Sequence, residues 1–342
     1  MMKFLGSGTA LAVCLFAGAA LAEDGLTFSS WGGVYQEAQR KVFLDPIEKE
    51  MGIKVREETL TGLAEVRAQV LSGTVAWDIV DLGLEECAQG EKEGLFEPLD
   101  TSKISFDGFD KDAYSQSWAA IIYYSTVLAY NKETMGDDPP KNWTDFWDTK
   151  KFPGARALYN KPQTMLEAAL LADGVPKDQL YPLDVDRAFK KLEQIKDDVD
   201  VWWTSGAQSV QLLADGEVDM IAMWNGRVDA LKAEGLPVDM TYDQGTLSMD
   251  CLAVPKGSKH KDLAMKVIGR MLSPDLQAHM PAAINYGPTT SLAFDQGVIT
   301  DEQIANSPSS PEHMKSQAVI SGKWWAEHAA EVQERWDAFL LK

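Results

Sequence analysis

Serine and aromatic residues stand at the end of the first apolar segment of the chain. Ser30 and Trp31 close the strand-like segment 26–31, and Tyr35 follows after two glycines. Asp81 stands near the end of a later apolar segment. In sheets of parallel strands, ligands bind outside the carboxyl ends of the strands. These side chains therefore predict a small-molecule site at one edge of a sheet.

Signatures of enzyme active sites are absent from the sequence. It contains no nucleophile elbow, no zinc-protease motif, no phosphate-binding loop and no dinucleotide fingerprint after a strand. The four histidines have no metal-ligand spacing. We therefore expect no catalysis, no cofactor and no metal site.

One tyrosine pair leaves a metal alternative open. Tyr123 and Tyr124 are adjacent, and paired tyrosines ligate ferric ions in some exported proteins. Two β-strand tyrosines beside Ile121 and Ile122 are the favoured interpretation, because aromatic and β-branched residues prefer strands. A ferric-ion receptor remains a remote alternative.

The elements that must position these side chains alternate between strands and helices. The first hundred residues predict strand, helix, strand, helix, strand at 26–31, 34–50, 53–58, 63–71 and 77–82. Further strands are expected at 118–130, 220–224 and 247–255, and further helices at 185–195, 261–272 and 323–340. The order predicts an α/β fold in which helices cover the faces of a parallel sheet.

Length, composition and charge limit the class of protein. A chain of 342 residues with 45% hydrophobic content is long enough for two globular domains. The formal net charge of −20, without a dense basic run, argues against nucleic acid as a partner.

The first 22 residues predict a cleaved export signal. Lys3 precedes the apolar run 10–20, and Ala20-Leu21-Ala22 forms a small-x-small cleavage site. The run is too short to span a membrane. We therefore expect the mature chain to be exported.

Export leaves two cysteines, Cys87 and Cys251, in the mature chain. An oxidising compartment permits a disulfide, but neither cysteine has metal or redox spacing. Two unpaired thiols are slightly favoured.

Several separated motifs resemble one family. These motifs are Ser29-Ser30-Trp31-Gly32-Gly33-Val34-Tyr35, Trp143-Thr144-Asp145-Phe146-Trp147, Trp224-Asn225-Gly226, Met249-Asp250-Cys251-Leu252-Ala253-Val254-Pro255 and Asn285-Tyr286-Gly287-Pro288-Thr289. In this order they resemble the exported solute-binding proteins of ABC transporters, in the spermidine/putrescine-binding branch and its relatives. Each motif alone is weak, but together they span nearly all of the mature chain.

The resemblance implies a type II periplasmic-binding fold of two α/β lobes joined by hinge crossover strands. Lobe one would comprise residues 23–127 plus 251–342, and lobe two residues 128–250. Residues 124–131 would form the first crossing and 247–255 the return. Ligand would bind in the cleft, and the lobes would close by hinge motion.

The resemblance also implies the site. Asp250 falls on the family's ammonium-binding aspartate, and Trp31, Tyr35, Trp224 and Tyr286 supply aromatic walls that suit an amine. Ser30 completes the expected ligand-binding set at the first strand end.

Two departures from the polyamine pattern concern charge. Arg227 follows Trp224-Asn225-Gly226, where polyamine receptors carry small or acidic residues, and Lys161 stands near the place of their second acidic pair. An arginine binds a carboxylate through a planar two-donor fork and repels a diammonium ligand. This pairing with Asp250 resembles receptors for 4-aminobutyrate. Pairing of Arg227 with Asp219 or Asp229 is the alternative.

The sequence therefore predicts a periplasmic substrate-binding component of an ABC importer for a small amine-bearing solute. A zwitterionic ω-amino acid such as 4-aminobutyrate is the favoured ligand, and putrescine or spermidine is the alternative. The expected partner is an ABC permease in the inner membrane, and the expected oligomeric state is a monomer.

Overall fold

The computed structural model describes residues 25–310 and 312–341. The export signal predicted for residues 1–22 lies outside the described residues. Within the described part of the chain, no helix is long and apolar enough to cross a membrane.

One mixed sheet runs through the molecule in the order β2-β1-β3-β8-β4-β7-β5-β6, with β10 beside β8 and β9 beside β4. The strands are β1 (Gly25–Ser30), β2 (Lys54–Thr59), β3 (Ile79–Gly83), β4 (Trp118–Asn131), β5 (Arg156–Tyr159), β6 (Val201–Trp203), β7 (Met220–Trp224), β8 (Val238–Ala253), β9 (Gly287–Pro288) and β10 (Ala318–Val319). Strands β1, β2 and β3 pair in parallel, as do β5, β6 and β7. The predicted parallel β-α-β units are thus present twice.

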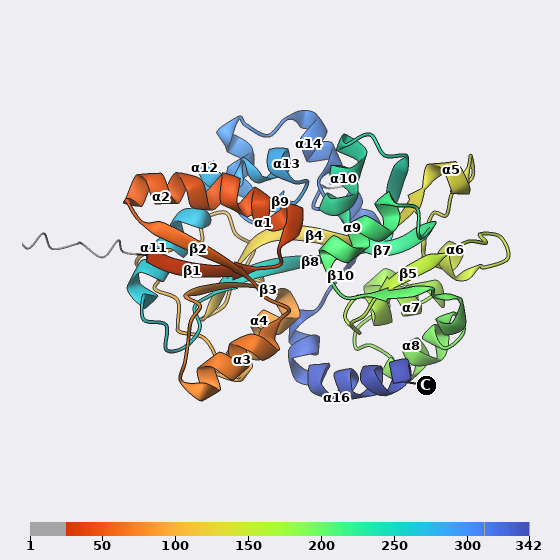
Figure 1. Cartoon of the computed structure of the whole chain (residues 1–342), viewed down its shortest axis with the longest axis horizontal. Coiled ribbons are helices and arrows are strands. Elements are labelled where there is room, and N and C mark those ends of the chain that lie inside the picture. Colours follow the sequence, from red (N-terminus) through yellow and green to blue (C-terminus); the bar gives the residue numbers. More distant parts are fainter. Residues whose placement is uncertain (1–24, 311, 342) are drawn as a thin grey trace, which may run out of the picture.

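Helices cover both faces of this sheet (Figure 1). The α-helices are α1 (Gly33–Gln39), α2 (Asp45–Met51), α3 (Leu63–Ser72), α4 (Leu84–Lys92), α5 (Lys132–Met135), α6 (Trp143–Trp147), α7 (Met165–Ala172), α8 (Val185–Leu192), α9 (Gly206–Ala214), α10 (Asn225–Ala233), α11 (Lys261–Met271), α12 (Pro274–Gln277), α13 (Met280–Ala283), α14 (Asp301–Asn306), α15 (His313–Ser316) and α16 (Gly322–Leu341). A π-helical turn, η1 (Arg40–Leu44), joins α1 to α2, and short 3-10 turns occupy η2 (Lys177–Gln179), η3 (Lys196–Asp198) and η4 (Ser291–Gln296).

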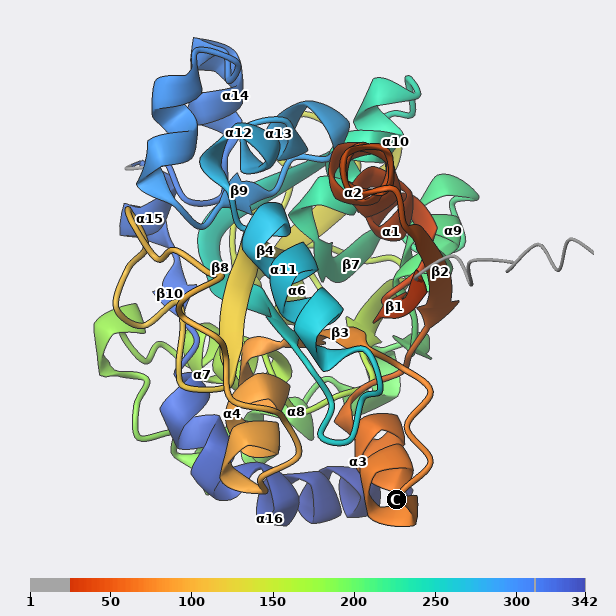
Figure 2. The same ribbon diagram turned by 90° about the vertical axis from the view of Figure 1, so that its left-hand side faces the viewer.

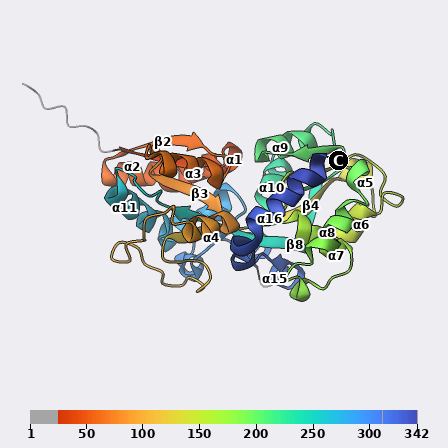
Figure 3. The ribbon, with the colours of Figure 1, turned by 90° about the horizontal axis from the view of Figure 1, so that it is seen from below.

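Two long antiparallel strands, β4 and β8, join the two halves of the sheet. One end of this pair contacts β3, and β4 continues into the second half beside β7. Figure 3 shows the two halves side by side with β4 and β8 running between them. This arrangement is the two-lobe fold that the sequence predicted.

The apolar cores follow the two halves. Lobe one has one core under α1, α2 and α11 and another under α3 and α4, on opposite faces of its sheet (Figure 2). Lobe two has a single large core built on β7 and the fully buried helix α7.

The terminal helix α16 packs on the lobe-two core. Trp325 and Trp336 are fully buried there, and the indole of Trp325 donates to Glu167 of α7 at 2.8 Å. The division of the chain into lobes remains a prediction. The helix also contacts α4 of lobe one, where Lys92 donates to the Ala326 carbonyl at 3.0 Å. Because its buried side chains belong to the lobe-two core, we propose that residues 318–341 accompany lobe two, whereas the sequence assigned them to lobe one.

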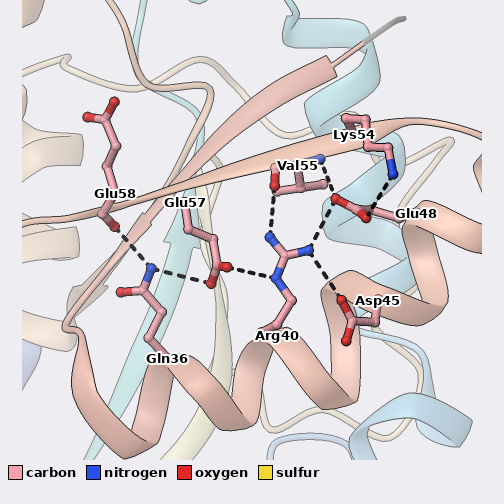
Figure 4. Close-up of polar contacts among 8 residues, drawn as sticks. All are labelled: Gln36, Arg40, Asp45, Glu48, Lys54, Val55, Glu57 and Glu58. Carbon is pink, nitrogen blue, oxygen red and sulfur yellow. Dashed lines mark hydrogen bonds and ion pairs between the residues drawn. The ribbon is translucent and has the colours of Figure 1, made fainter.

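The helix predicted at 34–50 is continuous but changes its winding at η1. Arg40, the first residue of η1, contacts Glu57 at 2.7 Å, Glu48 at 3.1 Å and Asp45 at 3.3 Å, and also donates to the carbonyl of Val55 at 2.8 Å (Figure 4). These contacts tie the helix to β2. The three carboxylates that pair with the Arg40 guanidinium all belong to lobe one.

Strand β8 begins nine residues before the predicted segment 247–255. Its first half, from Val238, is largely half-exposed, whereas its second half is fully buried. Because the first half lacks a continuous apolar run, hydrophobicity alone did not reveal it.

The two mature-chain cysteines are joined as a disulfide between α4 and β8, with their Cα atoms 6.6 Å apart. The expectation of two unpaired thiols was wrong. The cysteines are 164 residues apart in the sequence, so their spacing does not indicate a pair. They meet because α4 packs directly on β8.

Candidate ligand-binding site

A cavity with about 520 Å³ of empty space lies between the two lobes. Its wall consists of Trp31, Tyr35, Gly83, Glu85, Tyr124, Tyr159, Lys161, Gln163, Thr164, Trp224, Arg227, Asp250 and Tyr286. Six of the seven predicted site residues are in this wall. The exception is Ser30, whose hydroxyl donates to Gln39 at 2.7 Å and lies 3.2 Å from Asp81, behind the wall.

Four of the lining residues lie at or directly after strand ends. Trp31 follows β1, Gly83 ends β3, Tyr159 ends β5 and Trp224 ends β7. Asp250 lies on the crossing strand β8, opposite Gly83. The carboxyl ends of the parallel strands in both lobes thus meet at one cleft, where α/β sheets place their ligands.

One end of the cavity is acidic. The Asp250 side chain is buried, and this burial, reinforced by the charge of Asp81, raises its pKa well above the usual range. The hydroxyl of Tyr35 donates to Asp81 at 2.8 Å, so Tyr35 stands between the two carboxyls. A cationic group placed here would favour the ionised form of the carboxylates and offset the free-energy cost of burying their charge.

Two further carboxyls strengthen this end. Burial raises the pKa of Asp81 to about 7, although hydrogen bonds from Tyr35, Gln39 and Ser30 oppose the shift. Burial, together with the neighbouring Glu86, also raises the pKa of Glu85 to about 7. The acidic end can therefore hold protons near neutral pH when no cation is bound.

The cavity wall also contains Arg227, which is 1% exposed. Its guanidinium makes one long hydrogen bond, to the carbonyl of Gly32 at 3.4 Å, and lies 5.2 Å from the centre of the Trp224 ring. Its Nε has no hydrogen-bond partner in the described chain. A Cβ at Gly206 would lie 2.3 Å from the Arg227 Cζ, so this glycine makes room for the guanidinium.

The alternative partners of Arg227 are occupied elsewhere. Asp219 accepts the backbone N–H of Ala155 at 2.9 Å, and Asp229 accepts the side-chain amide of Asn285 at 2.7 Å. Over residues 25–310 and 312–341, no carboxylate lies within ion-pair distance of Arg227. A buried guanidinium without a carboxylate is costly unless an anion binds to it.

Aromatic rings make up much of the cavity wall. Tyr35 and Tyr286 meet edge to face with ring centres 5.3 Å apart, and Trp224 contacts Tyr159 in the same way at 5.6 Å. The Tyr124 ring lies between these two pairs, with its centre 6.2 Å from that of Tyr286 and 6.4 Å from that of Trp224. Such walls suit methylene groups and an ammonium ion.

Seven lining residues were not among the predicted site residues: Gly83, Glu85, Tyr124, Tyr159, Lys161, Gln163 and Thr164. Tyr159 ends the short strand β5, which the sequence analysis did not identify. Thr164 has a φ of 67°, a backbone conformation that residues other than glycine rarely adopt. Residues with such backbone conformations cluster at functional sites. The sequence analysis noted Tyr124 only because it is adjacent to Tyr123.

The paired tyrosines do not point to a common place. Tyr124 lines the cavity, whereas the hydroxyl of Tyr123 donates to Asp110 at 3.0 Å on the other face of β4. Successive side chains of a strand point to opposite faces. This geometry is unsuited to the ferric alternative.

The chain resembles solute-binding proteins along most of its length. The family described as bacterial extracellular solute-binding protein matches residues 43–309. A gamma-aminobutyric acid-binding protein from Pseudomonas aeruginosa is 34% identical and covers 96% of this chain and 94% of its own. A spermidine/putrescine-binding periplasmic protein from Escherichia coli is 24% identical, over 92% of this chain and 90% of its own.

Solved structures agree with this assignment. An ABC transporter substrate-binding protein from Bradyrhizobium japonicum is 46% identical, covers 93% of this chain and 99% of its own, and superimposes with a TM-score of 0.87. MotA from A. tumefaciens, in complex with glucopine, is 38% identical over 92% of this chain and 99% of its own, with a TM-score of 0.89.

An open protein is less similar. AttC from Agrobacterium tumefaciens, in an open unliganded conformation, is 33% identical over 93% of this chain and 100% of its own, with a TM-score of 0.66.

Proposed function

This chain belongs to the bacterial extracellular solute-binding protein family, and we propose that it binds a zwitterionic ω-amino acid such as 4-aminobutyrate. Its role is that of the substrate-binding component of an ABC importer. The observation that carries the choice of ligand is the buried Arg227, which faces the cavity and has no carboxylate partner in the described chain.

The two ends of the cavity would divide the ligand between them. Arg227 would hold the carboxylate through its fork of donors, as arginine does in other sites. Asp250 would hold the ammonium group, with Glu85 nearby and Asp81 behind. Trp31, Tyr35, Trp224 and Tyr286 would contact the methylene chain between the ends.

Polyamine binding is the second candidate, favoured by the acidic end and the aromatic walls. A diammonium ligand would place its second cation beside Arg227. At about 4 Å and an effective dielectric constant of about 20, that encounter is unfavourable by about 4 kcal/mol. A carboxylate at the same position reverses the sign of the interaction. The amino acid is therefore preferred over putrescine.

We further propose that the protein delivers its ligand to a membrane permease without changing the ligand chemically. Its relatives are solute-binding proteins, and one of them is named periplasmic. We propose that residues 1–22 direct export to the periplasm and are then removed.

A thermal-shift screen tests the choice of ligand. A ligand at 100 times its dissociation constant stabilises the folded protein by about 2.7 kcal/mol. 4-Aminobutyrate should raise the melting temperature, whereas butyrate and butylamine, which each lack one charged end, should raise it far less. A larger shift with putrescine or spermidine would favour the polyamine alternative.

A further inference from the structure

One ion pair reaches across the cleft at the edge of the cavity. Lys161 follows β5 in lobe two, and Glu86 lies in the first turn of α4 in lobe one. The Lys161 Nζ lies 3.4 Å from the Glu86 Oε1 and donates to the carbonyl of Thr61 at 3.3 Å. Among the ion pairs of the described residues, this is the one that joins the two lobes.

The chain leaves space for this pair at Gly62. A Cβ there would lie 2.3 Å from the Glu86 Oε1 and 3.3 Å from the Lys161 Nζ. Gly62 also has a φ of +139°, which L side chains rarely adopt. The Glu86 Oε1 additionally accepts the backbone N–H of Leu63 at 3.2 Å, which fixes the carboxylate beside the glycine.

The pair also stands between two spaces. On its inner side, Lys161 lines the ligand cavity and lies 5.6 Å from the Trp31 ring centre. On its outer side, Lys161 and Glu86 line an open groove of about 1450 Å³ between α3, α4 and α16. Separation of the two side chains would connect the cavity to the groove.

From this placement we propose that Lys161 and Glu86 form a latch that closes the outer wall of the cavity and limits the length of the ligand. The latch exists only when the lobes meet, because its two halves belong to different lobes. It therefore favours the closed conformation directly. A ligand longer than the cavity would extend into this wall and separate the pair. The statement about ligand length rests on the proposed function.

Latch variants test the proposal by two independent readouts. The first readout is the inter-lobe distance without ligand, measured by electron paramagnetic resonance between spin labels on the exposed residues Ala68 and Asp178. The second is the dissociation rate of 4-aminobutyrate. The variants are Lys161→Gln, Glu86→Gln and the double variant. Lys151→Gln, an equal charge change in an exposed lobe-two ion pair, is the control.

Each single variant should shift the distance distribution towards open lobes and accelerate dissociation roughly three- to tenfold. The double variant should add little to either single change, because both remove one interaction. The control should behave as wild type. Lys161→Gln should also reduce the preference for 4-aminobutyrate over the longer 8-aminooctanoate.

Unchanged distances in both single variants would overturn the latch, whichever ligand the protein binds. Strictly additive effects in the double variant would do the same. If wild-type protein bound neither amino acid, the proposed function would fail, and the distance measurement would still decide the latch.

Discussion

Two arginines show how this chain uses the same side chain for different purposes. Arg40 is on the surface of lobe one, where three carboxylates and a carbonyl satisfy its guanidinium (Figure 4). Arg227 is 1% exposed and donates to the carbonyl of Gly32 at a long distance of 3.4 Å. A charge that the protein's own groups satisfy needs no ligand, whereas a buried charge without a carboxylate partner in the described chain is costly unless an anion binds to it. We propose that Arg227 is of the second kind.

The largest expected effect comes from exchanging each arginine for glutamine. Arg227→Gln should weaken binding of 4-aminobutyrate by about 2–5 kcal/mol, which is at least about thirtyfold, because a buried carboxylate would lose its partner. The free energy of unfolding should not fall. Arg40→Gln should leave affinity unchanged and lower the free energy of unfolding by about 1–2 kcal/mol. Calorimetric titration and urea unfolding measure the two quantities.

The opposite pattern would break the comparison. If Arg227→Gln destabilised the ligand-free protein and spared affinity, Arg227 would be a structural residue like Arg40.

The acidic end provides the second test. Asp250→Asn keeps the shape of the side chain and removes its charge, so affinity for 4-aminobutyrate should fall by about 1.5–3 kcal/mol. Asp243→Asn removes an exposed charge from the same strand and is the matched control. Isothermal titration should give the control the affinity of wild type. Equal affinities in Asp250→Asn and wild type would remove Asp250 from the site.

The pH dependence of binding sharpens the comparison further. Asp81 and Glu85 have pKa values raised to about 7, so they hold protons near neutral pH in the ligand-free protein. An ammonium group favours the ionised carboxylates and should expel protons on binding. Affinity should therefore rise between about pH 6 and pH 8, by up to about tenfold per unit for each proton released.

Titrations in buffers of different ionisation enthalpy should detect proton release at pH 6.5. The raised pKa values also mean that these two carboxyls destabilise the ligand-free fold progressively as pH rises from about 4 through 7. Proton uptake on binding, or an affinity that is flat across this range, would contradict the assigned acidic end.

The smallest expected effect concerns the aromatic wall. Trp224→Phe removes the larger ring that lies beside Arg227 and Tyr159, and should weaken binding by about 0.5–1.5 kcal/mol. Trp147 in α6 is not a lining residue of the cavity, so Trp147→Phe should leave affinity and the binding-induced fluorescence change as in wild type. An unaltered affinity and spectrum in Trp224→Phe would count against a contact with ligand.

Local patterns predicted those parts of the fold that depend on apolar periodicity. The alternation of strands and helices between residues 25 and 83 follows from hydrophobic spacing and glycine stops such as Gly52, which ends α2 with a φ of 66°. The first half of β8 was missed because its side chains are half-exposed on the lobe-two side. The disulfide was missed because it joins residues 164 positions apart.

The site divides in the same way. Arg227 and Asp250 could be identified because motifs and charge mark them, and both line the cavity. Lys161 was noted only as a change of charge from the polyamine pattern, Glu85 stands in no motif, and the cavity brings the two side chains together. Ser30 lies behind the wall instead, because a strand-end position does not decide which way a side chain points.

Competition between two ligands of nearly equal length tests the central claim most directly. 4-Aminobutyrate and putrescine share one ammonium end and differ in the charge that would meet Arg227. Calorimetric titration of wild-type protein with each should give an affinity for the amino acid at least about tenfold higher, because the unfavourable encounter with the second ammonium exceeds 1.4 kcal/mol. Equal or tighter binding of putrescine would contradict the account.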